Sequence, residues 1–516
     1  MTIIYYTIVT FLVGIISLHL WVWAYWKRRG MKGPIGIPFF GSLLEMTSHT
    51  TPPFLQVREW TKVYGPVFGI TEGLQTTLVI SDTELINEVF IKQYDNFYGR
   101  KLNPIQGNPE TDKRVNLFSS QGHRWKRLRA ISSPTFSNNS LRKILVTVED
   151  SALELLRHIE KGTSNGESIE MLDYYQEFTM DVIGRIAMGQ TDSQMFANPM
   201  LPHVKAIFGE GRRGLFIFGA IFPVMSQLLR AFIFKFPYLG GSPIVPIFQG
   251  ISEAVTKRMK QREEDEKNGI EQGEPADFID LFLDARADVD LDAERSEDFS
   301  KAGSKVNRQL TVNEIIGQCA VFLIAGFDTT ALSLSYSSYL LATHPEVMKK
   351  LQEEIDRECP DPSISFDQLS KLKYLDCIIK ETLRMYPLGA MAVSRRCMRS
   401  TKLGDLKIEV GTNILADSWT VHYDKKIWGE DAEEFRPERW EHGEEQFFKN
   451  GYVPFGNGPR QCIGMRLAYM EEKLLLSHIL RKYSFETTKQ TDIPLKLYGR
   501  ATTQPRSVKL NLKQRY

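Results

Sequence analysis

The chain has 516 residues and an almost balanced charge, with 64 Lys and Arg against 63 Asp and Glu and a formal net charge of +1. This balance excludes the basic surface of a typical nucleic-acid-binding protein, and 37 Gly and 24 Pro are too few for a fibrous or disordered chain. The five cysteines contain no Cys-x-x-Cys pair, which excludes a cysteine-rich metal site and a disulfide framework. We therefore expect one large folded unit in a reducing compartment.

The N-terminal residues 2–26 predict a membrane anchor. They contain no Asp, Glu, Lys or Arg and exceed the roughly 20 residues that span a bilayer. The basic cluster Lys27-Arg28-Arg29 follows the apolar stretch, whereas a cleaved signal peptide carries its basic residues in front. Because positive charge favours the cytoplasmic side, we expect a single crossing with the body in the cytosol. Residues 27–38, with two prolines, predict a short stiff linker to a body over residues 39–516.

The body is predicted to be mainly helical with small β-sheets. Residues 67–71 and 77–81 predict one hairpin, and residues 406–409 and 413–416 predict a second. The apolar region over residues 214–252 is broken by Pro223 and Arg230, so it predicts helices that enter the membrane interface or cover an apolar pocket, with ordinary core helices as the alternative. The polar residues 286–308 predict a solvated linker.

A long helix is predicted after Thr311. Thr311-x-x-Glu314 is a capping-box pattern, and no proline follows until Pro345, which predicts a helix of around thirty residues. Its middle, Ala325 to Thr330, places a glycine and several polar side chains in an otherwise apolar helix. Either Asp328 and Thr329 take part in chemistry, or the glycine allows close packing and the threonine bonds its own i−4 carbonyl. The helix pattern by itself leaves both interpretations open.

The sharpest motif is the glycine-rich loop at residues 455–464, which brings Cys462 to the start of a helix. Backbone N–H groups of the loop and of the helix N-terminus favour a thiolate. Gly464 leaves room for a flat macrocycle, and Arg460 offers a positive charge to an acidic cofactor edge. A buried structural thiol is the alternative for Cys462 taken alone.

The pattern F-x-x-G-x-R-x-C-x-G at residues 455–464 resembles the haem-binding loop of the cytochromes P450. The same family pattern is matched, in the family's order, by Trp125-x-x-x-Arg129, residues 325–330, Glu381-x-x-Arg384 and residues 436–440. The chain resembles most the membrane-bound, reductase-dependent animal enzymes that oxidise steroids and xenobiotics. The resemblance implies a mainly α fold with small β-sheets, the cytochrome P450 fold, behind one N-terminal transmembrane helix, with residues 39–516 as the catalytic domain.

The cofactor implied by the resemblance is haem b, iron protoporphyrin IX, with the Cys462 thiolate as the iron ligand. The other implied haem-binding residues are Trp125, Arg129, Arg395, Phe455 and Arg460. Arg396 is the alternative to its neighbour Arg395 for contact with a haem propionate. Glu381, Arg384 and Arg439 form a structural triad in the family, and we assign this triad to folding.

Thiolate ligation of a haem iron favours cleavage of the O–O bond, so the resemblance implies a monooxygenase that hydroxylates or epoxidises lipophilic small molecules with O2. Thr329 and Asp328 are the implied catalytic residues, as a route for protons. No glycine-rich nucleotide fingerprint follows a strand, so NADPH and flavins are expected only through a partner, NADPH-cytochrome P450 reductase, with cytochrome b5 as a second donor. The implied location is the endoplasmic reticulum membrane.

A basic docking face for the reductase is predicted from five residues: Arg124, Lys126, Arg127, Arg466 and Lys473. By resemblance the substrate contacts come from five segments: residues 102–117, 216–236, 325–329, 388–393 and 498–503. These segments are mostly apolar and predict lipophilic substrates, without ordering steroids, fatty acids, terpenoids and toxins. Two alternatives are a haem-thiolate isomerase or dehydratase that needs no reductase, and a haem-binding sensor without catalysis.

Overall fold

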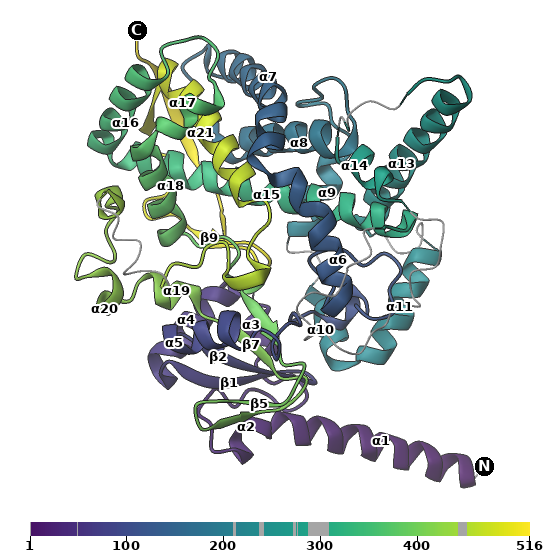
Figure 1. Ribbon diagram of the computed structural model, residues 1–516. Coiled ribbons are helices and arrows are strands. Elements are labelled where there is room, and N and C mark those ends of the chain that lie inside the picture. Colours follow the sequence, from purple (N-terminus) through teal and green to yellow (C-terminus); the bar gives the residue numbers. More distant parts are fainter. Residues whose placement is uncertain are drawn as a thin grey trace.

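The structure is a computed structural model, and it describes the chain except residues 1, 49, 210–212, 237–241, 272–274, 276, 287–308 and 442–450. Helices make up most of the molecule, and small β-sheets gather mainly at the end from which the N-terminal helix extends (Figure 1). The prediction of a mainly α fold with small sheets is confirmed. The predicted linker over residues 286–308 lies almost wholly outside the described residues.

The N-terminal helix α1 (Thr2–Trp23) is a candidate transmembrane anchor. Its mean hydropathy is 2.0 and it is almost entirely exposed, whereas α15 (Val312–Thr343), also long and apolar enough, is mostly buried and is the core helix. A turn at Ala24 separates α1 from α2 (Tyr25–Arg28). Trp26 of α2 is buried in the body, where its Nε1 donates to the Ile70 carbonyl oxygen at 2.9 Å. The anchor helix therefore ends three residues earlier than predicted, and the chain joins the body at Trp26.

The largest sheet has the strand order β1-β2-β7-β4. Its strands are β1 (Val67–Glu72), β2 (Gln75–Ile80), β4 (Ser394–Arg396) and β7 (Asn413–Ala416). β1 and β2 form the first predicted hairpin, which is confirmed. The second predicted hairpin is wrong in its pairing, because β7 pairs with β2 and β4, while β6 (Leu406–Ile408) pairs with β5 (Thr401–Leu403). All four residues of β7 are buried, so this strand gains more from the sheet interior than from a short surface hairpin.

The helical core is arranged around α15. The Thr311–Glu314 capping box forms as predicted, and the helix runs for 32 residues. It packs most extensively on α8 (Met171–Met188), where a Cβ on Gly326 would lie 3.1 Å from the Ile183 side chain. Close packing is therefore one role of this glycine. Figure 1 shows α15 crossing the molecule between α8 and the C-terminal helix α21 (Met465–Lys482).

The remaining α-helices among the described residues surround α15 or cover the large sheet. They are α3 (Leu43–Met46), α4 (Pro53–Tyr64), α5 (Thr83–Asn87), α6 (Gly122–Ser132), α7 (Asn138–Thr163), α9 (Leu201–Phe208), α10 (Arg213–Ile221), α11 (Pro223–Lys235), α13 (Ile244–Lys267), α14 (Phe278–Asp284), α16 (Pro345–Glu358), α17 (Phe366–Lys371), α18 (Lys373–Met385), α19 (Ser418–His422) and α20 (Lys425–Trp428). Two small sheets complete the described chain: β3 (Ile169–Glu170), β11 (Lys509–Gln514) and β8 (Tyr483–Thr487) in one, and β10 (Gln504–Pro505) with β9 (Leu497–Tyr498) in the other.

The interrupted apolar region forms helices, as predicted. Helix α11 exposes Val224, Met225 and Leu228, which are 76%, 55% and 69% exposed. The corner between α10 and α11 also contacts the anchor, because the ring nitrogens of His19 lie 2.9 Å from the Ile15 carbonyl oxygen and 3.1 Å from that of Ile221. An exposed apolar helix therefore lies beside the end of the candidate anchor.

Candidate active site

The cysteine loop is held by its own backbone. The Cys462 N–H donates to the Phe455 carbonyl oxygen at 2.9 Å, and the Asn457 side chain accepts from the Gly458 N–H. Gly458 has a φ of +70°, and a Cβ there would lie 2.0 Å from the Phe90 carbonyl oxygen, so only glycine fits. The Phe455 ring lies 5.7 Å from the Tyr469 ring of α21. The loop is thus fixed both to the helix that follows it and to the chain at Phe90.

The Cys462 thiol is crowded by protein and yet open on one side. Burial raises its pKa, and the backbone of Gly464 and Met465 and the charges of Arg129 and Arg100 lower it. The loop therefore supplies the donors that the sequence predicts, but burial outweighs them in the free protein. The side chain is nevertheless exposed. A bound metal cation deprotonates a coordinating thiol outright, so this cysteine is suited to a metal ligand rather than to a free thiolate.

Four arginines surround the thiol: Arg100, Arg129, Arg395 and Arg460. Burial, with the repulsion of the neighbouring guanidinium groups, lowers the pKa of Arg100 to about 9 and that of Arg460 to about 10. The same causes hold the pKa of Arg395 well below its usual range, and burial lowers that of Arg129. None of the four has a carboxylate partner among the described residues. The positive charge of this cluster is therefore uncompensated within the described protein.

The bonds that these arginines do make go to neutral groups. Arg100 donates to the Ala392 carbonyl oxygen at 2.8 Å, Arg395 to that of Asn457 at 3.0 Å, and Arg129 to that of Gln461 at 2.9 Å. The guanidinium group of Arg460 lies 4.8 Å from the centre of the Trp125 ring.

The Nε atoms of Arg100, Arg395 and Arg460 are buried without any hydrogen-bond partner. Unused donors and unbalanced charge beside a thiol fit a group that carries two carboxylates and a metal, as haem b does.

The sequence-predicted haem-binding residues therefore come together. Trp125 and Arg129 reach the site from α6, Arg395 from β4, and Arg460 from the cysteine loop. Arg395 is buried and Arg396 is exposed, so the geometry favours Arg395 over its neighbour. Sequence reasoning missed Arg100. It lies in no motif, and only its burial beside the other three arginines reveals it.

Asp328 and Thr329 face different surroundings although they are adjacent on α15. Thr329 is half-buried, one turn from the exposed Ala325, and its hydroxyl donates to the Ala325 carbonyl oxygen at 2.7 Å. Asp328 is fully buried, and burial raises its pKa. Its carboxylate accepts from Gln176 of α8 at 3.1 Å, from Thr502 at 2.7 Å and from Gln504 of β10 at 2.8 Å. The i−4 bond considered from the sequence is present, and the Asp328 side chain makes no hydrogen bond to Thr329 in the described structure.

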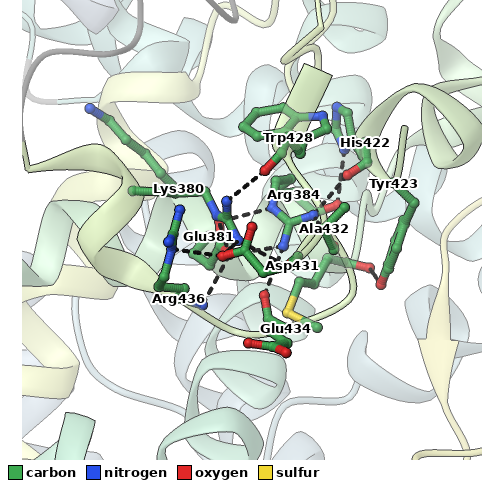
Figure 2. Close-up of polar contacts among 12 residues, drawn as sticks. Lys380, Glu381, Arg384, His422, Tyr423, Trp428, Asp431, Ala432, Glu434 and Arg436 are labelled. Atoms are coloured by element: carbon green, nitrogen blue, oxygen red, sulfur yellow. Dashed lines mark hydrogen bonds and ion pairs between the residues drawn. The ribbon is translucent and has the colours of Figure 1, made fainter. Parts of the chain in front are cut away.

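The predicted triad is a closed network of hydrogen bonds and ion pairs (Figure 2). Arg384 makes two bonds to the Glu381 carboxylate, at 2.9 and 2.8 Å, and Arg439 makes one at 2.8 Å. Arg384 also donates to the carbonyl oxygens of His422, Ala432 and Glu434, and the Trp440 Nε1 donates to Glu381 at 3.0 Å. Arg439 also pairs with Asp431 at 3.4 Å, so two carboxylates of the chain compensate the two arginines.

Hydrogen bonds and one contact between a cation and an aromatic ring connect the five predicted substrate segments. Asn103 donates to the Phe216 carbonyl oxygen at 3.0 Å, which joins residues 102–117 to α10. The Arg500 guanidinium lies 4.8 Å from the centre of the Phe216 ring, which joins residues 498–503 to the same helix. The Thr503 N–H donates to the Leu388 carbonyl oxygen at 2.9 Å, and Thr502 bonds to Asp328. Segments separated by up to about four hundred residues of sequence therefore meet near α15.

The predicted docking face is wrong in two of its five residues, Arg127 and Lys473, because both are buried. Arg124 and Arg127 form ion pairs with Glu314, at 3.0 and 2.6 Å. Lys473 is buried and pairs with Asp376 at 2.6 Å. These cations stabilise the interior, because each is held by a carboxylate of the same chain. Arg466 is exposed, as a docking residue requires.

The fold, the thiol loop and the arginine cluster together define a haem-thiolate protein, and the comparisons give the family. The family model of cytochrome P450 matches residues 31–512, so the chain belongs to the cytochrome P450 family and is a monooxygenase with haem b as its cofactor. It is 64% identical to cytochrome P450 CYP13A10 of Caenorhabditis elegans over the whole of both chains. It is 62% identical to CYP13A1 of the same organism, over 98% of this chain and 97% of the relative.

Proposed function

We propose that this monooxygenase hydroxylates or epoxidises lipophilic small molecules at the endoplasmic reticulum membrane, with NADPH electrons supplied by NADPH-cytochrome P450 reductase and cytochrome b5 as a second donor. The observation that carries the proposal is the meeting of five mostly apolar segments near Asp328 of α15, in a chain whose Cys462 thiol is exposed. Apolar walls with few polar groups suit lipophilic ligands. The apolar α1 and the exposed face of α11 support a location on a membrane.

In this proposal the chain's own residues hold the cofactor and exclude water. Cys462 holds the iron, and Arg100, Arg129, Arg395 and Arg460 hold the two propionates with their unused donors. When bound, haem b supplies the oxygen-activating iron. The residues around the site contribute binding, orientation and protons.

The protons are assigned to α15. Thr329 is half-buried on α15, and its hydroxyl can turn from the Ala325 carbonyl oxygen to a bound molecule. Asp328 holds a proton more readily than an exposed carboxyl because burial raises its pKa. Its partners Thr502, Gln504 and Gln176 fix its carboxylate on the side of α15 toward α8 and β10. We assign Thr329 to direct proton delivery and Asp328 to holding the proton.

The test begins with the full chain in membranes. The reduced protein with carbon monoxide is expected to give the thiolate-type spectrum, and Cys462→Ala is expected to abolish it. With the reductase and NADPH, oxidised products are expected from lipophilic compounds, and none without NADPH. An intact thiolate spectrum with no product from a broad panel would refute the monooxygenase proposal for small lipophilic substrates.

Thr329→Ala separates this proposal from the isomerase and sensor alternatives. The variant is expected to divert NADPH electrons into hydrogen peroxide and to lose coupled product, while Thr329→Ser, which keeps the hydroxyl, retains coupling. Unchanged coupling in the alanine variant would contradict the assignment of Thr329.

A further inference from the structure

Two arginines beside the substrate segments have no carboxylate partner among the residues that the structure describes. Arg500 lies in the turn between β9 and β10, half-buried, with its guanidinium 4.8 Å from the centre of the Phe216 ring. Arg213, the first residue of α10, is half-buried, and its side chain contacts the Thr47 hydroxyl at 3.3 Å and the Leu44 carbonyl oxygen at 3.5 Å. No carboxylate within the described chain forms an ion pair with either arginine.

Other cations of the same region are compensated. Arg230 of α11 pairs with Asp112 at 2.5 Å, and Lys101 pairs with Glu72. Glu45, the acidic residue of α3 next to the Arg213 contacts, forms no ion pair with Arg213, and one of its carboxylate oxygens is buried without a partner. Within the described residues, the lack of an ion-paired carboxylate therefore distinguishes Arg213 and Arg500 from the neighbouring cations Arg230 and Lys101.

The two guanidinium groups also repel each other. Burial lowers the pKa of Arg500, and the charge of Arg213 lowers it further. Two like charges at a half-buried place, with no ion-paired carboxylate in the described part of the chain, resemble the arginine cluster around Cys462. An external anion would relieve the repulsion and use the free donors.

The position of Arg500 connects it to the reaction site. Thr502 lies two residues further along the chain and donates to Asp328 of α15, so the Cα atoms of Arg500 and Thr502 are at most about 7 Å apart. Phe216, under the Arg500 guanidinium, belongs to one of the apolar substrate segments. A cation that is placed over an aromatic ring at the edge of an apolar site suits a ligand with one charged end and a hydrocarbon body.

We infer that Arg500, together with Arg213, binds the carboxylate of an acidic lipophilic substrate, so that the enzyme prefers amphiphilic acids to neutral molecules of the same shape. The inference rests on the proposed function and specifies the substrate class of that same site. Arg500 makes the direct charge-assisted bonds, and Arg213 adds a second positive charge.

The probes are dodecanoic acid and its methyl ester, which share a hydrocarbon chain and differ in charge. Binding to the detergent-solubilised full-length holoenzyme is measured from the substrate-induced change in haem absorbance. The wild type is expected to bind the acid roughly tenfold more tightly than the ester. Arg500→Gln is expected to remove that preference and leave the ester affinity unchanged, and Arg500→Lys to restore part of it. Arg213→Gln is expected to weaken acid binding by a smaller factor, which decreases at high salt.

Arg506→Gln is the matched control, because Arg506 is an exposed arginine six residues from Arg500, and it is expected to change neither affinity. Equal losses for acid and ester in Arg500→Gln would show that Arg500 only supports packing on Phe216, and would overturn the inference. Equal binding of acid and ester by the wild type would also overturn it. If neutral compounds are oxidised with NADPH but acids are not preferred, only this inference fails; if nothing is oxidised, the proposed function itself fails.

A phospholipid head group is the other source of an anion near a membrane-facing helix. Co-sedimentation with phosphatidylcholine vesicles, with and without phosphatidylserine, tests this source. We expect Arg500→Gln to leave vesicle binding unchanged. Selective loss of binding to the phosphatidylserine vesicles, with no change in the ratio of acid to ester affinity, would assign Arg500 to the membrane surface and overturn the inference.

Discussion

Two clusters of buried arginines differ in what neutralises them. In the Glu381 network, Arg384 and Arg439 converge on one carboxylate, Arg439 also pairs with Asp431 at 3.4 Å, and the remaining donors reach carbonyl oxygens. Around Cys462, Arg395 and Arg460 find carbonyl oxygens but no carboxylate in the described chain. Arg384, Arg439, Arg395 and Arg460 are all at most 4% exposed, so the depth of burial does not explain the difference.

The difference separates residues that build the scaffold from residues that wait for a ligand. A buried charge without a partner costs several kcal/mol, and a fold retains such charges where a bound group of opposite sign compensates them. A network that is complete within the chain contributes to folding whether or not the cofactor is bound. Substitutions in the two clusters should therefore have different consequences.

The largest expected effect is that of Glu381→Gln. It leaves the buried Arg384 without its carboxylate and Arg439 with only Asp431 at 3.4 Å, and breaking a buried pair in this way costs about 3–5 kcal/mol. We expect a large decrease in the melting temperature and little incorporated haem, measured by thermal denaturation and by the yield of the thiolate-type spectrum. Glu88→Gln, which breaks an exposed pair with Lys92, is the control and should have little effect. Normal stability in Glu381→Gln would show that the network is not essential to the fold.

Removing one unpaired arginine should have a smaller and different effect. Arg395→Gln relieves repulsion in the protein without haem, so its stability should not decrease, whereas the holoenzyme should lose haem about tenfold faster. The two measurements are the thermal unfolding of the haem-free protein and the rate of haem transfer to an excess of apomyoglobin. Arg396→Gln is the matched control, an exposed arginine one residue away. Equal haem loss in both variants would remove Arg395 from the propionate site.

The Glu381 network could be predicted from the sequence, but part of the arginine cluster around Cys462 could not. Glu381-x-x-Arg384, the cysteine loop and the Thr311–Glu314 cap are local patterns whose geometry follows from helix and turn spacing, and the structure has all three. Partners distant in sequence were missed, as for the Asp328 bonds to Thr502 and Gln504. The error in strand pairing has the same cause. β6 and β7 form at the predicted residues, but each pairs with a strand other than the predicted one, because the partners are distant in sequence.

The charge of a residue does not show from the sequence whether its side chain is exposed or paired within the chain. Arg127 and Lys473 resemble surface cations in sequence, but each finds a carboxylate in the interior. Arg100 belongs to no motif and joins the haem-side cluster through the fold. Whether a cation is free or paired depends on tertiary contacts, and this property separates a scaffold arginine from a ligand-binding one.

Trp440→Phe should destabilise the fold through the Glu381 network, but less than Glu381→Gln does. It removes the indole donor to Glu381 at 3.0 Å but keeps the aromatic packing on Trp428, whose ring centre is 5.5 Å away. A hydrogen bond to a charged group contributes about 2 kcal/mol. We expect a modest decrease in melting temperature with normal haem content. An unchanged melting temperature would show that the two arginines alone satisfy Glu381.

The smallest expected effect is a pH dependence of the folding stability through His422, which contacts Arg384 of the Glu381 network. Its Nε2 accepts from the Val453 N–H at 3.0 Å, and its Nδ1 lies 3.0 Å from the Arg384 carbonyl oxygen, so the neutral ring fits both contacts. Burial, with the charge of Arg384, lowers the pKa of His422 from 6.5 to about 3. As the pH falls, His422 is therefore protonated in the unfolded chain before it is protonated in the folded protein. The contribution of His422 to the free energy of unfolding is complete above pH 6.5 and decreases as the pH falls toward 3. The decrease is at most about 1.4 kcal/mol per pH unit. The melting temperature should fall between pH 6.5 and 5 more steeply in the wild type than in His422→Gln, whereas parallel profiles would show that other groups cause the loss.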